Sequence, residues 1–224
     1  MPNTESLKKD FDELALICHP KWDHNIHYYK YLSRLIPDKC ETILDIGCGN
    51  GEFARLISNK SKKIVCADIS PEMISIAKSQ SKNYHNLEFD AINVFHKNIP
   101  PGSFDCVVSI ATFHHYLLED VLRRSMEWLK KDGILVVFDV YKPKTFFDYV
   151  YSLFAVIPDV FLNFIKNGRV RESKQIRRVW NNHSKNDRVI TFNEVCKAAF
   201  RASATVKIHR HLFWRYSMIC KKYN

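Results

Sequence analysis

The chain has 224 residues, a hydrophobic content of 46% and a formal net charge of +10. This length and composition suit one domain, with or without a large insertion, and exclude a disordered or fibrous protein. The seven cysteines are odd in number and include no C-x-x-C pair, which argues against both a disulfide framework and a zinc ribbon and predicts reduced thiols in a cytoplasmic protein.

The first 40 residues are expected to form a helical cap. Two helix-like stretches cover about residues 5–17 and 24–36; Pro20 separates them and Pro37 ends the second. The charged start of the chain, MPNTESLKKDFDEL, has no apolar run ahead of a small-residue cleavage site, so it is not typical of a secretory signal. We therefore expect residues 1–40 to cover one face of a cytoplasmic protein.

From residue 41 to residue 140, short β-rich runs alternate with helical segments. The five expected strands are ETILDI (41–46), KIVCAD (63–68), LEFDAINV (87–94), FDCVVSI (104–110) and GILVVFDV (133–140). Helix candidates lie between them, near 51–59, 71–80 and 117–131. A parallel sheet that is covered on both faces requires apolar runs of this kind, separated by helices. The pattern predicts a doubly wound α/β fold with a cofactor-binding core at 41–140.

After residue 140 the alternation stops. An aromatic-rich segment at 146–165 is followed by a basic stretch at 166–188, and a helical pattern near 191–200 precedes two β-like runs at about 203–209 and 212–220. We expect a helical lid or insertion at 141–190, and a final helix and β-hairpin at 191–224.

The segment at 146–165 is long enough to raise the question of a membrane span. Asp148, Pro158, Asp159 and Asn163 interrupt it, so we expect no transmembrane segment. Two interpretations remain: a lid buried over the active site, or an amphipathic surface that touches a membrane.

The positive charge is concentrated near the C-terminus. Residues 165–224 contain fifteen Lys or Arg and three acidic residues, about +12, which leaves about −2 for the rest of the chain. This charge is consistent with a solvated basic face on an enzyme that acts on a small molecule. It could also attract an acidic substrate, RNA or anionic lipid. The oligomeric state is not predicted.

A glycine-rich turn follows the first expected strand. The strand ETILDI runs directly into Gly47-Cys48-Gly49-Asn50-Gly51 and then into a helix that begins near Glu52. Glycines let such a turn bend and let a ligand lie against the main chain, while the helix N-terminus offers free N–H groups. The turn therefore predicts a site for a nucleoside-bearing cofactor, although a simple packing turn would need the same residues.

An acidic residue closes the second expected strand. Asp68 stands 23 positions after Asp45 and can accept hydrogen bonds from both ribose hydroxyls of a nucleoside. Dinucleotide enzymes use the same arrangement, so this feature alone does not separate NAD from S-adenosylmethionine. The glycines stand as G-x-G-x-G and not as G-x-G-x-x-G, which fits a dinucleotide site poorly.

Four segments occur together and in order: Leu44 to Gly51, Ala67 to Met73, Ser103 to Ser109, and Phe113 to His115. Over residues 41–140 the chain therefore resembles the class I S-adenosylmethionine-dependent methyltransferases, in particular the type 11 subfamily. The resemblance implies S-adenosylmethionine as cofactor. It also implies a seven-stranded Rossmann-like sheet whose last two strands form an antiparallel hairpin.

The resemblance implies a role for each matching residue. Asp45 would orient the loop near the amino acid end of the cofactor, and the three loop glycines would lie along its methionine and ribose. Asp68 would accept from the ribose hydroxyls, while Ile69 and Met73 would pack on the adenine. The cofactor-binding candidates are Asp45, Gly47, Cys48, Gly49, Gly51, Asp68, Ile69, Met73, Asn93, Val94 and Ile110.

One candidate departs from the family pattern. The family usually has Asp about ten residues before the Ser of Ser-Phe-Asp, and this chain has Asn93 there. Its side-chain oxygen can still accept a hydrogen bond from the adenine amino group, without a charge. We expect Asn93 and Val94 at the adenine, with Asp90 as the alternative. The chain also has Lys131-Asp132-Gly133 where the family usually has paired glycines, which affects a turn.

Methyl transfer from a sulfonium is an in-line displacement, in which alignment can supply about 7–11 kcal/mol in favourable cases. A dedicated base is therefore optional. The catalytic candidates are His114 and His115, just after the fourth strand, and the alternative is that they only shape the site. No convergent set of four metal ligands can be named among the histidines, so we expect no metal site.

The acceptor-binding candidates are Trp22, His24, Tyr28 and Tyr141. The run from Trp22 to Tyr29 resembles the lead segment of small-molecule members of the family, and aromatic faces attract a sulfonium. Tyr141 follows the fifth strand. The alternative is that these aromatic residues belong to the hydrophobic core and do not contact the acceptor.

The leading hypothesis is methyl transfer to a small-molecule acceptor. Methylation of RNA or lipid is the alternative suggested by the basic C-terminal third, and a non-catalytic S-adenosylmethionine-binding protein is the alternative suggested by Asn93 and the optional base. An NAD-dependent oxidoreductase fits the glycine spacing and the terminal hairpin poorly.

Overall fold

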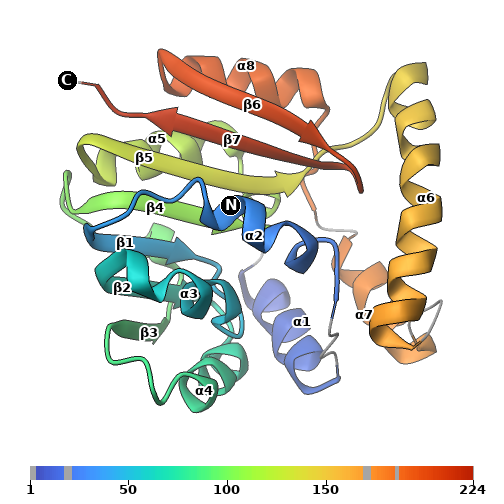
Figure 1. Cartoon of the computed structure of the whole chain (residues 1–224), viewed down its shortest axis with the longest axis horizontal. Helices are drawn as coiled ribbons and strands as arrows, with labels where there is room; N and C mark the ends of the chain where they lie inside the picture. Colours follow the sequence, from blue (N-terminus) through green and yellow to red (C-terminus); the bar gives the residue numbers. More distant parts are fainter. Residues whose placement is uncertain (1–3, 18–21, 169–172, 185–186, 224) are drawn as a thin grey trace.

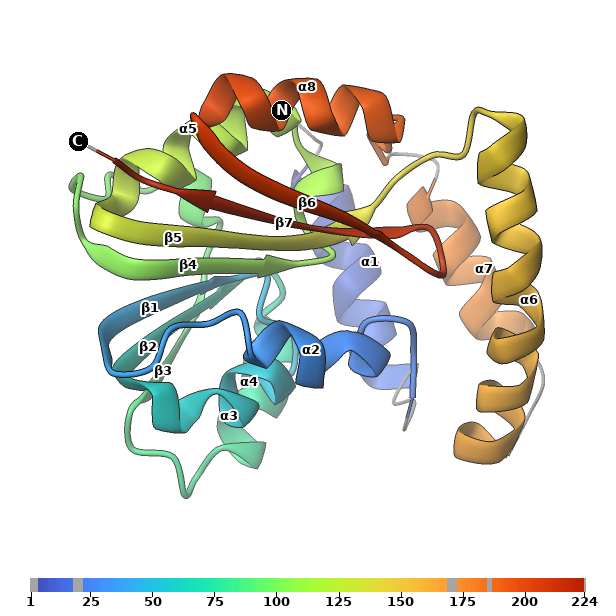
Figure 2. The same ribbon diagram turned by 45° about the horizontal axis from the view of Figure 1, so that its top comes forward.

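The computed structural model describes residues 4–17, 22–168, 173–184 and 187–223. Its centre is a seven-stranded sheet with the strand order β3-β2-β1-β4-β5-β7-β6, seen from two directions in Figures 1 and 2. Strands β1 to β5 run parallel, and β7 runs antiparallel to β5 and β6. The strands are β1 (Cys40–Ile46), β2 (Ser61–Asp68), β3 (Leu87–Ala91), β4 (Phe104–Ile110), β5 (Leu129–Val140), β6 (Thr205–His211) and β7 (Arg215–Lys221).

This strand order confirms the predicted doubly wound sheet with an antiparallel hairpin at its end. The strand β4 has the predicted bounds, whereas β3 ends at Ala91 and β5 already begins at Leu129. The early start of β5 has a visible cause, because Leu129 pairs with Phe104 of β4 and the next residue, Lys130, forms an ion pair with Asp105. These pairings end the preceding helix at Trp128 instead of the predicted residue 131.

Helices lie on both faces of the sheet. The α-helices are α1 (Thr4–Ile17), α2 (Tyr29–Ser33), α3 (Glu52–Leu56), α4 (Pro71–Gln80), α5 (Leu118–Trp128), α6 (Phe146–Asn167), α7 (Lys174–His183) and α8 (Phe192–Ala202). Short 3-10 helices include η1 (Ile26–Tyr28), η2 (Ser58–Lys60), η3 (Val94–His96) and η4 (Phe113–His115). The predicted helix at 24–36 is thus divided into η1 and α2, and the one at 51–59 into α3 and η2.

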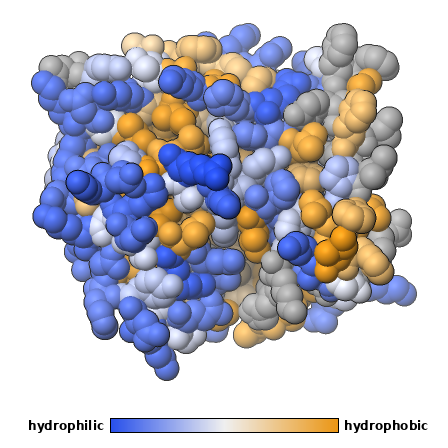
Figure 3. Space-filling model, in the orientation of Figure 1, coloured by the Kyte–Doolittle hydropathy of each residue, from blue (hydrophilic) through white to orange (hydrophobic). Residues whose placement is uncertain are grey.

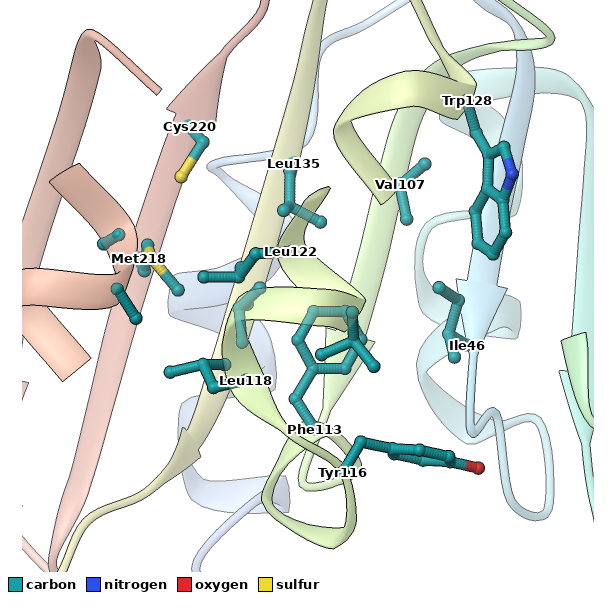
Figure 4. Packing of buried hydrophobic residues seen from close by; sticks show 14 of the residues in the cluster. Ile46, Val107, Phe113, Tyr116, Leu118, Leu122, Trp128, Leu135, Met218 and Cys220 are labelled. Carbon is teal, nitrogen blue, oxygen red and sulfur yellow. The ribbon is translucent and has the colours of Figure 1, made fainter. Parts of the chain in front are cut away.

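The strands are buried on both faces, as the apolar runs predicted. In β4, Val107 packs with the residues of α5 and α8, while its neighbours Cys106 and Val108 pack with those of α2, α3 and α4. Figure 4 shows the first of these layers, in which Leu118 and Leu122 of α5 face the sheet. This two-sided core holds the carboxyl ends of the parallel strands at one edge of the sheet.

Residues 146–165 lie in the helix α6, which has Pro158 inside it and begins with a capping box of Thr145 and Asp148. Asp159 and Asn163 of α6 line the cavity described below, and Leu162 packs against Trp22 and Phe213. Other apolar side chains of the helix face solvent, since Phe154 and Phe161 are 67% and 61% exposed. Within the described residues, every helix falls short of the length and apolar character that a membrane crossing requires.

Candidate active site

A cavity of about 1290 Å³ lies at the carboxyl ends of the parallel strands. Its walls come from the loop after β1, the end of β2, the segments after β3 and β4, and the helices α1, α6 and α7. Figures 1 and 2 both show these three helices on the side to which β1 and β4 point. Because β1 and β4 lead in opposite directions along the sheet, this is the switch point at which doubly wound folds bind ligands.

The loop after β1 is fixed by contacts that only glycine permits. Gly47 has φ +72°, its N–H donates to the Ala67 carbonyl oxygen at 2.7 Å, and a Cβ placed on it would overlap the Thr112 side chain. Gly49 has φ +53°, and a Cβ there would meet nothing within 4 Å. The main chain at Gly49 therefore stays open to a ligand in the cavity.

The third glycine of the loop does not have its predicted place. Gly51 is absent from the cavity wall, and a Cβ on it would come within 2.8 Å of the Phe89 ring. It precedes α3 with φ +74°, so its function is to bring the helix close to β3. Every other cofactor-binding candidate lines the cavity.

Asp68 ends β2 with its carboxylate held by two backbone donors. Oδ2 accepts from the Gly49 N–H at 2.9 Å and Oδ1 accepts from the Ser70 N–H at 2.9 Å. Burial raises the pKa of this carboxyl group, and the two backbone hydrogen bonds oppose the rise. Each oxygen has a further lone pair, so the carboxylate can bind the loop and still accept from a ligand.

Asp45 is a buried acid without a full set of partners. It is 2% exposed, and its Oδ2 has no hydrogen-bond partner among the described residues. Burial, together with the charge of Asp68, raises the pKa of Asp45 to about 7. A cationic ligand beside Asp45 would stabilise its ionised form.

Asn93 presents a donor to the cavity. Its Oδ1 accepts from the Phe95 N–H at 3.0 Å, while its Nδ2 is buried without a hydrogen-bond partner in the described part of the chain. The sequence predicted an accepting oxygen at the adenine, but that oxygen already closes the turn into η3. The alternative, Asp90, is exposed and does not line the cavity.

Two histidines of η4 lie at the other end of the cavity. The Asp139 carboxylate accepts from the His114 backbone N–H at 2.9 Å and lies 2.6 Å from Nδ1 of the same residue. Burial alone would lower the pKa of His114, but the charge and hydrogen bond of Asp139 outweigh it and raise that pKa. His115 is 2% exposed, with Nδ1 3.0 Å from Asp187 Oδ1, and burial lowers its pKa to about 4.

The candidates for acceptor binding separate into two groups. Trp22, His24 and Tyr141 line the cavity, and His24 Nε2 lies 2.8 Å from the Asp159 carboxylate of α6. Tyr28 does not line the cavity. Its ring packs 5.0 Å from that of Phe138 on the sheet, away from the cavity.

Comparison with known proteins agrees with this geometry. Residues 44–137 match the model of a protein family described as the type 11 Methyltransferase domain. This range includes the glycine loop after β1, Asp68, Asn93 and the histidines of η4. Over residues 44–137 the chain belongs to the type 11 family of methyltransferase domains. The fold, the order of the motifs and the family match therefore agree.

The chain is 32% identical over 156 residues to malonyl-acyl-carrier-protein O-methyltransferase 2 of Ilyobacter polytropus. The match covers 68% of this chain and 57% of that relative. Matches to uncharacterised mycobacterial methyltransferases, one from Mycobacterium tuberculosis, cover 47% of those proteins. The chain thus spans about half the length of the curated relatives that it matches.

Solved structures share the fold. One is a chain of the complex between the Haloferax volcanii Trm112 methyltransferase activator and a methyltransferase, with a TM-score of 0.68 and 15% identity over 96% of this chain and 98% of that one. Another is the cyclase SpnF, with a TM-score of 0.63 and 15% identity over 93% of this chain and 75% of that one. A fold shared by a methyltransferase and a cyclase leaves the reaction to be argued from the site.

Several cavity residues were not found by sequence reasoning. They are Phe11, Thr112, His183, Asp187 and Arg215. Thr112 stands beside the predicted histidines, so its place after β4 was a usable signal. The others belong to segments without a readable motif, and only the path of the chain brings them to the cavity.

Proposed function

We propose that the protein transfers a methyl group from S-adenosylmethionine to a small-molecule acceptor. The observation that carries the proposal is one cavity lined by the open main chain at Gly49 and by two buried carboxylates, Asp45 and Asp68. Such a lining suits a ligand with ribose hydroxyls and positive charge. The partnerless atoms Asp45 Oδ2 and Asn93 Nδ2 are the hydrogen-bonding groups that a bound cofactor would use.

The cofactor would supply an electrophilic methyl group on its sulfonium. Asp68 would accept from the ribose hydroxyls while it holds the Gly49 amide, and Asp45 would offset the positive charge of the amino acid end. The side chains of Ile69, Met73 and Val94 offer apolar surface for the adenine. The Asn93 amide would donate to a ring nitrogen.

The acceptor would enter between the histidines of η4 and the aromatic side chains of Trp22 and Tyr141. We propose that the whole chain acts as one methyltransferase domain in which α1, whose residue Phe11 lines the cavity, covers the acceptor end. The enzyme's contribution is then to exclude water and align the acceptor, which supplies about 7–11 kcal/mol in favourable reactions.

The first test is calorimetry with two cofactors. S-adenosylmethionine should bind in one equivalent and NAD should not bind. Release of S-adenosylhomocysteine with an acceptor panel then separates an enzyme from a cofactor-binding protein. Tight binding of NAD, or the absence of S-adenosylmethionine binding, would overturn the proposal.

The affinity for S-adenosylmethionine should depend on pH through Asp45. At a pH below about 7 the free protein carries a proton on this carboxyl group, which has to leave when a cation binds beside it. The affinity should therefore rise by about tenfold per pH unit towards pH 7 and level off above it. Calorimetry between about pH 5.5 and 7.5, in buffers of different ionisation enthalpy, would measure both the affinity and the proton release. Asp45→Asn should remove most of this dependence, and a flat wild-type profile would contradict the assignment.

A second candidate function is methylation of a lipid at an anionic membrane surface. It is favoured by the inverted orientation of α6, whose polar residues bind the domain: Asp148 accepts from Arg210 at 2.7 Å, and the Asn167 side chain donates to the Trp22 carbonyl oxygen at 2.8 Å. Among the described residues of α6, most of the exposed side chains are apolar, and Figure 3 shows hydrophobic residues on this side of the molecule. The exposed apolar residues of α6 are Val150, Phe154, Val160, Phe161, Phe164 and Ile165.

The neighbouring helix α7 exposes Lys174, Arg177 and Arg178. An apolar helix face next to such cations is typical of surfaces that rest on anionic lipid. The chain should sediment with vesicles that contain anionic phospholipid, more strongly at low salt. The double variant Phe154→Asp and Phe161→Asp should weaken this binding at least tenfold, by about 1.4 kcal/mol.

The matched control is Phe200→Asp, which changes a 65% exposed phenylalanine on α8. This variant should bind vesicles like the unaltered chain. Equal binding of all three proteins, or no binding of any, would exclude the membrane surface and leave the small-molecule proposal in place.

A further inference from the structure

Three histidines and one carboxylate converge at the acceptor end of the cavity. His114 and His115 belong to η4, His183 ends α7, and Asp187 follows it in the chain. One possible ligand atom from each of the four residues lies within 4.8 Å of the other three. This set could not be named from the sequence, because two of its members come from a segment that carries no metal-binding motif.

Asp187 lies at the centre of the cluster. Its carboxylate oxygens are 3.0 Å from His115 Nδ1, 3.9 Å from His183 Nε2 and 4.0 Å from His114 Nε2. Ligands at ordinary distances from one zinc-sized ion are about 3.0–3.5 Å apart from each other. Since the four donor atoms lie within 4.8 Å of one another, side-chain rotations that bring the most distant of them about 1 Å closer would place them around a common ion.

Two of the histidines have a second carboxylate behind them. Nδ1 of His114 is 2.6 Å from Asp139, and Nδ1 of His183 is 3.4 Å from Asp10. In both rings this leaves Nε2 as the nitrogen that faces Asp187. Histidines that bind a metal through one nitrogen usually present the other to a carboxylate, which fixes the tautomer and the ring orientation.

Hydrogen bonding between the described residues does not satisfy this cluster. The side chains of His115 and His183 are each 3% exposed. Nδ1 of His183 has only the Asp10 carboxylate at 3.4 Å, and the Asp187 carboxylate is 3.9 Å from Nε2 of the same ring, which is beyond hydrogen-bond distance. Buried imidazoles need partners, and a cation between His183 Nε2 and Asp187 would provide one.

We propose that His114, His115, His183 and Asp187 bind one divalent transition-metal ion, and that this ion holds an oxygen atom of the methyl acceptor. Three imidazoles and one carboxylate suit zinc, iron or cobalt better than magnesium or calcium, which prefer oxygen ligands. The four residues line the cavity, so a coordination position can face the acceptor. Metal binding at these four residues does not depend on the proposed methyl transfer. Only the statement that the ion holds the methyl acceptor rests on the proposed function.

A metal ion at this place changes the role of the two histidines of η4. An acceptor hydroxyl on a divalent ion loses its proton far more readily than a free one. His114 and His115 would then act as ligands, and the hydroxyl proton would pass to solvent water instead of to a histidine. The acceptor oxygen would bond to the methyl carbon as the carbon–sulfur bond of the sulfonium breaks and S-adenosylhomocysteine leaves.

The test is metal binding to the full chain after removal of metals with a chelator. Zn²⁺ followed by calorimetry, and Co²⁺ followed by its visible absorption, should each bind in one equivalent. His183→Ala and Asp187→Ala should each weaken this binding at least 100-fold, and His183→Gln serves as a second variant if the alanine variant folds poorly. His209→Ala, at an exposed histidine of β6, should bind like the unaltered chain.

Affinity for S-adenosylmethionine is measured on the same proteins. Metal binding without cofactor binding supports the metal site and overturns the proposed function, while cofactor binding without metal binding overturns the metal site alone. Equal metal affinity in His183→Ala, Asp187→Ala and His209→Ala would also overturn it. The variant Asp139→Asn should bind the metal about 10–100-fold more weakly than the unaltered chain, because the Asp139 carboxylate orients His114.

Discussion

Replacement of Asp68 by alanine is expected to lower the affinity for S-adenosylmethionine at least 100-fold. Hydrogen bonds to a charged group contribute about 1.5–3 kcal/mol each, and two ribose hydroxyls would lose such a partner. The same carboxylate accepts from the Gly49 N–H at 2.9 Å, so its removal also releases the loop that the cofactor contacts. A loss of about 2.7 kcal/mol corresponds to 100-fold, which titration calorimetry resolves.

The controls separate the ligand contact from the fold. Asp90→Ala removes an exposed carboxylate from β3, where Asp90 pairs in register with Ala67, the residue before Asp68. Its affinity should equal that of the unaltered chain. Asp68→Asn keeps one accepting oxygen, so its affinity for S-adenosylmethionine should lie between those of Asp68→Ala and Asp90→Ala. If Asp68→Ala folds, by circular dichroism and urea unfolding, and binds the cofactor normally, the cofactor site has been placed wrongly.

The sheet and the cofactor end of the site could be predicted because both depend on local sequence. A strand buried on two faces is a continuous apolar run, so β4 was found with its bounds. The carboxyl ends of β1 and β2 place the loop and Asp68 at one edge of the sheet. The same reasoning failed for Gly51. Its positive φ serves the approach of Phe89 from another strand, and a sequence does not show which neighbour a glycine accommodates.

The acceptor end could not be predicted in the same way. His115 and Asp187 are 72 positions apart and meet because α6 and α7 lead the chain back across the strand ends, a path that no sheet register dictates. The aromatic pattern of 146–165 showed an amphipathic helix but not its orientation. The ion pair of Asp148 with Arg210 turns the polar face inwards and leaves Phe154 exposed.

Gly47→Ala is expected to have the largest effect on the folded loop. Alanine at φ +72° costs about 1–2 kcal/mol, and its Cβ would overlap the Thr112 side chain, with Cγ2 at only 2.8 Å. The clash occurs between the ends of β1 and β4, where the Gly47 N–H also binds the Ala67 carbonyl oxygen. We expect the free energy of unfolding to fall by at least about 3 kcal/mol, which is in the range of the most destabilising single substitutions. Cofactor binding should be lost as well.

The variant Gly49→Ala separates the cost of backbone strain from the cost of steric overlap with a neighbouring side chain. Its φ of +53° imposes a similar backbone cost, but its Cβ meets nothing within 4 Å, so it should lose only about 1–2 kcal/mol of stability. Because that Cβ points into the open side of the loop, Gly49→Ala should still lose most of its cofactor affinity. The double variant Gly47→Ala, Thr112→Ala should regain part of the stability lost by Gly47→Ala, since it removes the overlapping Oγ1 and Cγ2. Equal stability of the two single variants in urea unfolding would contradict the close approach of the strands, and a normal cofactor affinity in Gly49→Ala would show that the ligand lies elsewhere.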